Sequence, residues 1–537
     1  MPLVVKKLGE SLAKSKKSST FAAVLRKRVK LLAVLVPLFP LVTLSSVAAI
    51  RLTDSLEYKV EMQASLAEGE HEPLWLNANK YGLSSLSKSN AYLRAQLLCP
   101  LDKWADPTWD LGYGIDLALA SGFTSKLVVQ QAYAELKYKK GLLTVGAKEF
   151  PMELKNQRLS SGSQALGINA RPVPQLRLEL PDYWTIPGLG GWAGLKGHVS
   201  YGMLTDNNWQ KGFTERSRKH AVNTLYHSKA GYVRLGKPGN RRLTVEAGLE
   251  MACLFAGDSY LYVNKKWQYI PNEKGVGALW HALIPSGGET IEPATYKNTS
   301  GDDLGAWVLR LNYDHGDWQL SLYGDHFFDD ESALFMVDYD GYGHGQEWNV
   351  KKDWHFFLYD MKDIMLGVEL QLRNNPWLSN VVVEYLSTKY QSGPIYHDHT
   401  PAISYHLGGR DNYYNHFVEP GWQHWGQVMG NPLFRSPLYN DSREISVENN
   451  RFTAWHLGAE GKPLPNVGYR LLATTQTGYG TYDNPYFRRK HNFSLMGEVT
   501  CGLTCGWSVT GAVAFDKGSI YGGNSGIQLT VSKKWKY

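Results

Sequence analysis

The chain has 537 residues, with 57 Lys and Arg against 50 Asp and Glu, a formal net charge of +7. Nine basic residues and one acidic residue lie in positions 1–30, which leaves 48 basic and 49 acidic residues, a net charge of −1, for the rest. Because a nucleic-acid-binding protein needs a basic surplus on its working surface, we exclude nucleic acid as a partner.

Residues 1–49 have the pattern of a signal peptide. A basic stretch is followed by the apolar run 31–42 and by small residues at 45–49. The run is short and contains Pro37 and Pro40, which argues against a spanning helix. We predict that the mature chain begins near Ile50 and that residues 50–537 form a single domain.

The mature chain alternates apolar and polar residues with a period of two, which is typical of strands with one apolar face. In the first such segment Tyr58, Val60 and Met62 share a face opposite Lys59 and Glu61. About eighteen segments follow this pattern or a weaker form of it: 57–66, 90–98, 111–119, 131–138, 141–149, 175–180, 195–203, 225–236, 243–255, 304–313, 317–328, 364–372, 379–388, 452–461, 466–477, 491–501, 507–515 and 526–537.

The first and last segments suggest how these strands are arranged. In 526–537 the residues Ile527, Leu529, Val531 and Trp535 share one parity, and the chain ends on an aromatic residue. This is typical of the closing strand of an outer-membrane β-barrel, whose apolar face meets lipid and whose polar face meets the lumen. A strand at the edge of a soluble sandwich is the alternative.

The lengths of the connections favour the barrel. Connections after even-numbered strands are mostly short, such as 139–140 and 314–316, whereas those after odd-numbered strands include the longest, 257–303, 329–363 and 389–451. Outer-membrane barrels place short turns in the periplasm and long loops outside. We therefore predict an all-β fold, a transmembrane antiparallel β-barrel of about 18 strands in the outer membrane.

Two local features add expectations. Residues 73–82 do not fit a strand and predict a short helix, ended by Gly82, that plugs the lumen or forms part of a loop. Cys253 lies on an apolar parity and is expected to be a free thiol facing lipid, whereas Cys501 and Cys505 flank a short turn that they could bridge.

Several long motifs resemble the Wzi capsule-assembly family in its Bacteroidetes-type form. They include Gln-Gln-Ala-Tyr at 130–133, Lys-Glu-Phe-Pro-Met-Glu-Leu-Lys-Asn-Gln at 148–157, Leu-Gly-Ile-Asn-Ala-Arg-Pro at 166–172, Pro-Asp-Tyr-Trp-Thr-Ile-Pro at 181–187 and Thr-Asp-Asn-Asn-Trp at 205–209. A second block covers Gly-Gly-Arg-Asp-Asn-Tyr-Tyr-Asn-His at 408–416 and Gly-Asn-Pro-Leu at 430–433. The resemblance extends over nearly the whole mature chain.

The resemblance implies a barrel whose lumen is plugged by short helices and inward-folded extracellular loops. It also implies lectin-like, non-catalytic binding of exported capsular or surface polysaccharide, and a role in capsule assembly and attachment. The expected partners are that polysaccharide and outer-membrane lipid, with the polysaccharide export machinery as a further candidate. No cofactor is expected.

The candidate binding residues combine aromatic faces, which pack on sugar rings, with Asn, Asp and Arg, which bond hydroxyls and carboxylates. The alternative is that the aromatic loop packs on itself and closes the mouth of the barrel, and that the basic connection 150–174 lines the lumen. The candidates in the two segments are Arg410, Asp411, Asn412, Tyr413, Tyr414, Asn415, Trp422, Trp425, Lys155, Asn156 and Arg171.

Other chemistries find little support in the residues. His397-Asp398-His399 lacks a decisive further metal ligand, so no metal site is expected. Asp325-His326 has no nucleophile placed beside it, which argues against an outer-membrane protease or lipid hydrolase. A substrate-specific porin for sugars or small anions remains the main alternative to the polysaccharide-binding barrel.

Overall fold

Alternating strands make up most of the chain and form one sheet. The computed structural model describes residues 56–101, 108–215, 218–239, 242–263, 265–284, 301–329, 363–391 and 411–536, with the short backbone pairs 397–398 and 406–407. The strands of this sheet are β1 (Glu57–Glu68), β2 (Ser89–Cys99), β3 (Trp109–Ser121), β4 (Leu127–Tyr138), β5 (Gly141–Ala147), β6 (Gln175–Thr185), β7 (Ala193–Met203), β9 (Leu225–Leu235), β10 (Arg242–Phe255), β13 (Asp302–Asp314), β14 (Trp318–Asp329), β15 (Ile364–Leu372), β16 (Asn380–Ser387), β21 (Arg451–Leu464), β22 (Val467–Gly480), β23 (Pro485–Gly502), β24 (Trp507–Gly518) and β25 (Asn524–Lys536).

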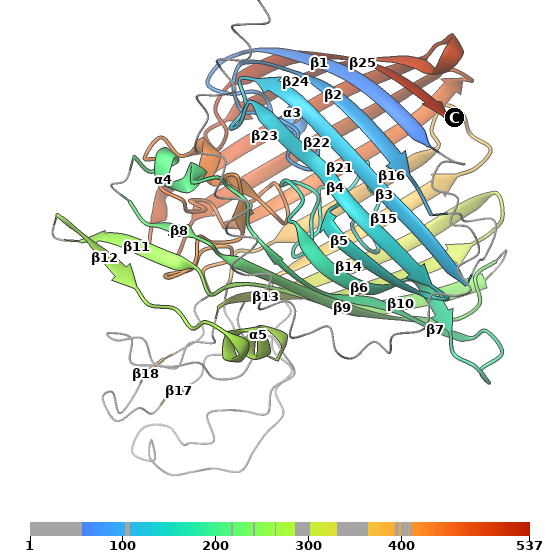
Figure 1. Ribbon diagram of the computed structural model, residues 1–537. Coiled ribbons are helices and arrows are strands. Elements are labelled where there is room, and N and C mark those ends of the chain that lie inside the picture. The colour runs from blue at the N-terminus through green and yellow to red at the C-terminus, as the bar shows by residue number, and fades with distance from the viewer. Residues whose placement is uncertain are drawn as a thin grey trace, which may run out of the picture. The chain divides into compact units, whose positions relative to one another are not determined.

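These 18 strands close into an antiparallel barrel (Figure 1). Each strand pairs with the next one along the chain that belongs to the sheet, and β1 pairs with β25 from Glu57 opposite Lys536 to Glu68 opposite Ser525. The closed sheet has no free edge, which removes the unpaired backbone groups that a bilayer cannot satisfy. The predicted barrel and its strand number are confirmed.

The period of two places apolar side chains on the outer wall. On β1, Val60 and Met62 are 41% and 57% exposed, whereas Glu61 and Gln63, which point inward, are 8% and 5% exposed. The other strands repeat this pattern, so apolar side chains ring the outside of the barrel. Such an apolar outer band is the surface that a barrel presents to lipid.

The two ends of the barrel differ in their connections. One end, here named the turn end, carries the short connections 139–140, 315–317 and 465–466 and both ends of the barrel chain. The opposite end, here named the loop end, carries the connections 69–88, 148–174, 204–224 and the stretch between β16 and β21. No helix in the described part of the chain is long and apolar enough to cross a bilayer.

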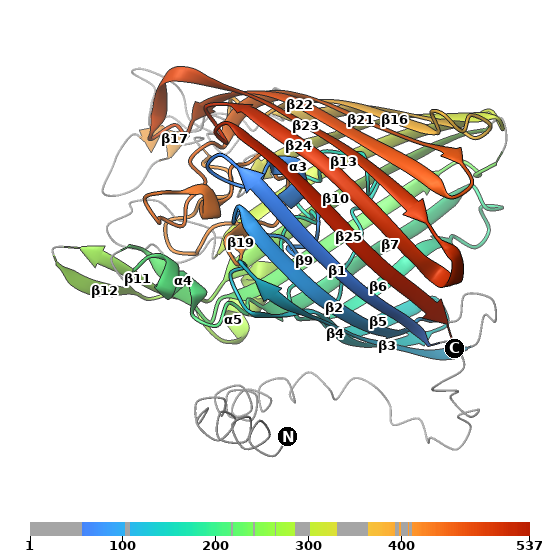
Figure 2. The ribbon, with the colours of Figure 1, turned by 90° about the horizontal axis from the view of Figure 1, so that it is seen from above.

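Three segments from the loop end, here named the plug segments, fold into the lumen: 69–88, 148–174 and 411–450. The first contains α3 (Leu74–Asn77), whose residues are all buried, and Figure 2 draws α3 inside the ring of strands. Trp75 Nε1 donates to Thr474 Oγ1 of β22 at 3.1 Å. Ser161 N donates to Glu384 Oε2 of β16 at 2.8 Å. Plug segments thus bond directly to the inner wall of the barrel.

Smaller elements complete the loop end. A three-stranded sheet is formed by β8 (His220–Val222), β11 (Asp258–Val263) and β12 (Lys266–Ile270). The helix α4 (Trp209–Phe213) contacts β8, whereas α5 (Val276–Leu283) contacts β9 and β10 of the barrel. The third plug segment contains β19 (Gln423–His424), β20 (Gln427–Val428) and the 3-10 turn η2 (Pro437–Tyr439). Elsewhere are β17 (His397–Asp398), β18 (His406–Leu407) and, in the turn between β23 and β24, η3 (Thr504–Gly506).

The structure corrects the predicted orientation of Cys253 and shortens the helix predicted in 73–82. Cys253 is a free thiol but does not face lipid, because α5 covers it and leaves it 0% exposed. The helix predicted in 73–82 is only the four residues of α3, and Gly82 adopts a positive φ of 67° after it. The predicted signal peptide and the side chains of His397, Asp398 and His399 lie outside the described residues.

Candidate functional site

A hollow of about 280 Å³ opens at the loop end between the first and third plug segments and α4. We name it the loop-end hollow. It combines aromatic rings, hydroxyl groups and one arginine, which are the side chains that protein sites use to hold sugars. Its lining residues are Gly82, Ser84, Ser85, Leu86, Ser87, Gly122, Phe123, Thr124, Arg171, Trp209, Phe213, Trp425, Gln427 and Leu438.

The short helix α4 brings two of the rings together. Asp206 accepts backbone hydrogen bonds at its start, from Asn208 N at 3.1 Å and Gln210 N at 3.4 Å, which satisfies N–H groups that a helix leaves unpaired. One helical turn then separates Trp209 from Phe213, and their rings stack with centroids 4.8 Å apart. Both rings are half-buried, so part of each face is open to the hollow.

Trp425 enters the hollow from the tight turn between β19 and β20. It adopts a left-handed φ of 55°, and Gly426 follows with a φ of 80°. A Cβ on Gly426 would lie 2.4 Å from the Trp209 ring and 2.7 Å from Leu438 Cγ. The turn therefore requires glycine at this position, both for its backbone conformation and for close packing of Trp209.

Arg171 forms the polar centre of the hollow. Its guanidinium carbon lies 4.4 Å from the centroid of the Trp425 ring, a cation–π arrangement. Its two terminal nitrogens donate to Ser125 Oγ and Thr124 Oγ1, both at 2.8 Å. The plane of the guanidinium is thus fixed by a ring on one side and two hydroxyl groups along its edge.

No carboxylate of the described residues forms an ion pair with this arginine. Arg171 is 6% exposed, and none of the ion pairs found among the described residues includes it. Burial without a counter-charge lowers its pKa to about 10. A buried charge is normally paired because desolvation costs several kcal/mol per ion. An unpaired guanidinium at the edge of a hollow therefore favours an anionic ligand.

His424 ties the hollow to the barrel rim. Its Nδ1 lies 2.9 Å from the carbonyl oxygen of Arg171, and its Nε2 accepts a hydrogen bond from Thr205 N at 3.2 Å. The ring must therefore be neutral, with its proton on Nδ1. Full burial lowers the pKa of His424 to about 4, which agrees with that assignment.

Three of the predicted aromatic residues lie elsewhere, in the core of the plug. Tyr413, Tyr414 and Trp422 are 2%, 1% and 1% exposed. Trp422 Nε1 donates to Ala165 O at 3.0 Å, and the Tyr414 ring stacks on Phe434 with centroids 4.0 Å apart. Tyr413 and Tyr414 can meet a sugar only if the plug segments move, and Trp422 lines only a second, smaller hollow of about 90 Å³ that Arg171 also lines.

The candidate binding residues of the second plug segment also fall into two groups: two contact the inner wall of the barrel, and one lines the loop-end hollow. Lys155 is buried against Asp325 of β14, with Nζ 2.5 Å from Oδ1. Asn156 Nδ2 donates to Glu369 Oε1 of β15 at 2.8 Å. Both side chains fasten the segment to the inner wall, and only Arg171 of the three basic-segment candidates reaches the loop-end hollow.

The remaining candidates stand at the start of the third plug segment. Asp411, Asn412 and Asn415 are half-exposed. Asn415 Nδ2 donates to Asn412 Oδ1 and Val447 O, each at 3.0 Å, so these amides shape the turn that contains Tyr413 and Tyr414. Arg410 lies outside the described residues. The role of all these residues in binding stays a prediction.

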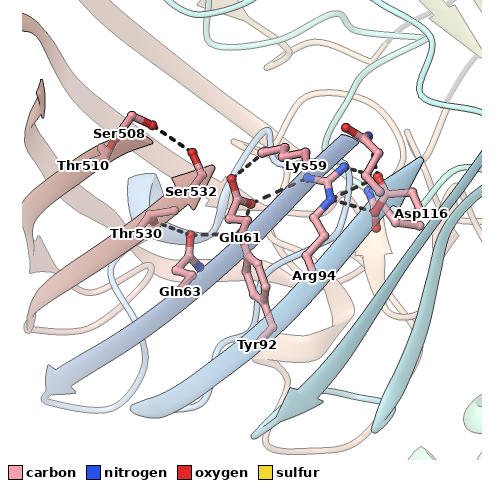
Figure 3. Close-up of polar contacts among 12 residues, drawn as sticks. Lys59, Glu61, Gln63, Tyr92, Arg94, Asp116, Ser508, Thr510, Thr530 and Ser532 are labelled. Atoms are coloured by element: carbon pink, nitrogen blue, oxygen red, sulfur yellow. Dashed lines mark hydrogen bonds and ion pairs between the residues drawn. The ribbon is translucent and has the colours of Figure 1, made fainter. Parts of the chain in front are cut away.

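The inner wall near the turn end is polar. In Figure 3, Arg94 of β2 donates to Asp116 of β3, with Nε 2.8 Å from Oδ1, and Tyr92 donates to Glu61 of β1 at 2.8 Å. Ser508 and Ser532 pair their hydroxyl groups at 2.8 Å across β24 and β25. This wall is hydrophilic, but its charged groups are largely paired with each other.

Sequence reasoning missed much of the lining of the hollow. Phe213, Thr124 and the serines at 84–85 belong to short polar stretches that carry no motif, and Trp209 was part of a family motif without an assigned role. An acidic or amide residue two or three positions before an aromatic residue, as in Asp206 and Trp209, is one signal of a capped turn that exposes a ring. Among the described residues, no cluster of His, Cys, Asp and Glu is arranged to hold a metal ion.

Comparison with known proteins gives a likeness of fold. No family model and no curated protein matches the sequence. Among solved structures, the chain is similar to Escherichia coli Wzi, described as a carbohydrate-binding β-barrel involved in group 1 capsule assembly, with a TM-score of 0.50 at 10% identity over 88% of this chain and 83% of that one. Acinetobacter baumannii OccAB4 matches at a TM-score of 0.43 and 9% identity over 90% of this chain and 99% of that one. The chain therefore has the fold of an outer-membrane β-barrel, at a distance that leaves its function to its own residues.

Proposed function

We propose that this protein is an outer-membrane barrel that binds an exported acidic polysaccharide in its loop-end hollow and helps to attach the capsule to the cell surface. The binding is lectin-like and non-catalytic. Arg171 carries the proposal, because it is buried, unpaired with any carboxylate of the described residues, and stacked on Trp425. Polysaccharide and outer-membrane lipid are the partners, and the polysaccharide export machinery is a further candidate.

The lining of the hollow supports a sugar with a carboxylate. Trp209, Phe213 and Trp425 offer aromatic faces to the apolar C–H surfaces of a sugar ring. Arg171 can form paired, charge-assisted hydrogen bonds with a carboxylate, the geometry for which a guanidinium is suited. Thr124 and the serines around position 85 add hydroxyl groups for the remaining polar atoms of the ring.

The plug supports a binding protein over a channel. The three plug segments fill the lumen with a buried apolar core that includes Trp75, Tyr414 and Trp422. Their contacts with the wall include the buried pair Lys155–Asp325. A path for solutes along the barrel axis requires these contacts to break, whereas surface binding leaves them in place.

Binding of purified polysaccharide tests the proposal directly. The barrel in detergent micelles is titrated with a uronate-containing capsular polysaccharide and with the same polymer after its carboxylates have been reduced to alcohols. Arg171→Gln is expected to weaken binding of the acidic polymer by roughly 10- to 100-fold, the effect of losing a charge-assisted contact, and to change binding of the reduced polymer little. Arg373→Gln, at the turn end and paired with Asp314, is the matched control.

Retention of capsule on cells tests the role in attachment. In a strain that lacks the gene, the polysaccharide is expected to be shed into the medium at a normal export rate. Complementation with the intact gene should restore cell-bound capsule, and complementation with Arg171→Gln and Trp425→Ala combined should not. Normal retention in the deletion strain would reject the attachment role.

A substrate-specific porin for sugars or small anions is the second candidate, and the polar inner wall of β1–β3 and β24–β25 favours it. Single-channel recording in planar bilayers separates the two functions. The polysaccharide-binding barrel should give no stable conductance. Stepwise conductance that a small sugar or anion blocks, together with no affinity for the polymer, would establish the porin instead.

A further inference from the structure

An unusual polar row lies on the outer wall of the barrel near the loop end. His227, Cys253 and Asp303 are direct neighbours across β9, β10 and β13. Cys253 shares its parity with Leu243, which is 58% exposed on the outer wall, whereas Glu250, of the opposite parity, bonds Tyr232 inside the lumen. The row therefore faces outward, where polar groups would meet lipid.

The helix α5 covers this row. Ala278 and Ala282 are 1% and 0% exposed and pack with Cys253 and Phe255. Figure 1 draws α5 beside β9 and β10, the two strands that it contacts. Small residues on the buried face of α5 allow the helix to approach the wall closely.

Two outward side chains fasten the helix to the wall. Lys229 of β9 donates its Nζ to the carbonyl oxygen of Ala282 at 3.0 Å and to that of Leu283. Tyr201 of β7 donates its hydroxyl group to Leu279 O at 2.8 Å. The Lys229 bonds satisfy two carbonyl groups that the end of a helix leaves unpaired and place a positive charge at its C-terminus, which the helix dipole favours.

The position of α5 along the barrel matches one edge of the lipid band. From Leu243 near the turn end to Cys253, β10 rises about ten residues, which is roughly 33 Å along the strand. At a typical tilt of about 40° this corresponds to roughly 25 Å along the barrel axis, the height of the apolar band of such barrels. The helix therefore lies at the boundary between acyl chains and headgroups on the loop-end side.

The face of α5 turned away from the barrel is apolar. Val276, Trp280 and Ile284 follow one another at a spacing of four residues and are 77%, 56% and 46% exposed. We infer that α5 is an interfacial helix that inserts this ridge into the outer leaflet of the membrane. Its partner is lipid, and its role is to seal the polar row against acyl chains and to hold the loop end at a fixed height.

Continuity with the outer wall identifies lipid as the partner. On the turn-end side of α5, Leu309 of β13 and Val233 of β9 are 46% and 41% exposed on the same outer face. The ridge formed by Val276, Trp280 and Ile284 therefore extends the apolar band. Tryptophan is enriched at membrane interfaces, where its ring is apolar and its N–H is polar. On another edge of the helix His281 pairs with Glu273, which lies just before α5, with Nδ1 2.7 Å from Oε2, so this edge is polar as expected for a helix lying in the interface plane.

Quenching of tryptophan fluorescence by brominated lipid tests the inference. The full chain is placed in phosphatidylcholine vesicles whose acyl chains carry bromine close to the headgroups, and in unbrominated vesicles. The fluorescence that Trp280→Phe removes is the signal of Trp280. This difference is expected to be roughly twofold weaker in the brominated vesicles, as for a ring at the interface.

Trp267→Phe is the matched control, because Trp267 is also exposed, at 39%, but lies on the β11–β12 hairpin. The fluorescence that Trp267→Phe removes should be the same in brominated and unbrominated vesicles, and acrylamide in the water should quench it. A Trp280 signal that acrylamide quenches and bromine does not would overturn the inference, and so would a signal that neither quenches, because protein would then cover the ridge. A heat-dependent shift in electrophoretic mobility verifies that each variant is folded.

Discussion

At the scale of single residues, the exposure of a side chain in the plug decides which chemistry it can perform. Trp422 and Trp425 are three positions apart in the same turn region, yet the first is 1% exposed and the second is half-open to the hollow. Local sequence does not distinguish them, because their difference arises from contacts with Ala165 and Arg171 far away in the chain. The sequence shows that the loop is rich in aromatic residues. It does not show which of them line the hollow and which are buried in the plug.

The tight fit at Gly426 gives a prediction about the geometry of the hollow. Gly426→Ala would force a side chain into the Trp209 ring at a backbone φ of 80°. We expect polysaccharide affinity to fall by about tenfold, since the aromatic faces are displaced, while the 18-stranded barrel stays folded. Titration calorimetry measures the affinity. Gly188→Ala is the control, because it also has a positive φ of 86° but would contact nothing within 4 Å.

The neutral state of His424 gives a prediction about pH. Its folded pKa of about 4 lies below its ordinary value of 6.5, so its stabilising effect is complete above pH 6.5 and is lost as the pH falls through about 4. Protonation would break the hydrogen bond from Thr205 N, at a cost on the order of 3 kcal/mol. Because the folded protein protonates His424 only near that pKa, polysaccharide binding should weaken as the pH falls through about 4, and His424→Gln should flatten that profile. His491→Gln, at an exposed site, should leave the profile as it is.

At the scale of elements, long-range contacts hold the plug segments in place. Lys155 and Asp325 are 170 positions apart, and each side chain is at most 1% exposed. The sequence indicated that 150–174 carries basic residues, but a pairing partner at that distance leaves no local pattern. The strands were predictable because their alternation is local, whereas the path of the plug through the lumen was not.

This buried pair makes the second plug segment sensitive to loss of one partner. Lys155→Met would leave the Asp325 carboxylate buried and unpaired, and we expect it to lower the free energy of unfolding by about 3–5 kcal/mol. The double variant Lys155→Met with Asp325→Leu should recover most of that loss. Urea unfolding followed by protease cleavage within 148–174 measures both. Arg373→Met, which removes a solvent-screened surface pair with Asp314, should lower the free energy of unfolding far less.

At the scale of the whole molecule, the apolar outer band sets the orientation in the membrane. Leu529, in the middle of β25, is 54% exposed on the outer face, and Leu503, at the turn end, is 55% exposed. An arginine in place of Leu529 is expected to destabilise the barrel in lipid vesicles by about 2–4 kcal/mol, and one in place of Leu503 by about 0–1 kcal/mol. If reversible unfolding experiments gave the same loss of stability for both arginine variants, Leu529 would not lie deeper in the bilayer than Leu503, which would contradict the position that we assign to the apolar band.

The seam between β1 and β25 has a consequence for how the barrel forms. Gln528 donates to Ser65 across this seam over 463 positions of sequence, so the sheet cannot close before the final strand is available. Until then both β1 and the growing end of the sheet expose unpaired backbone groups, which invite association with other chains. Closing so large a loop is slow, because its entropic cost must be met before any contact across the seam forms. Barrel closure should therefore be the late, rate-limiting event of folding, and variants that weaken the seam should aggregate during assembly although the finished barrel tolerates them.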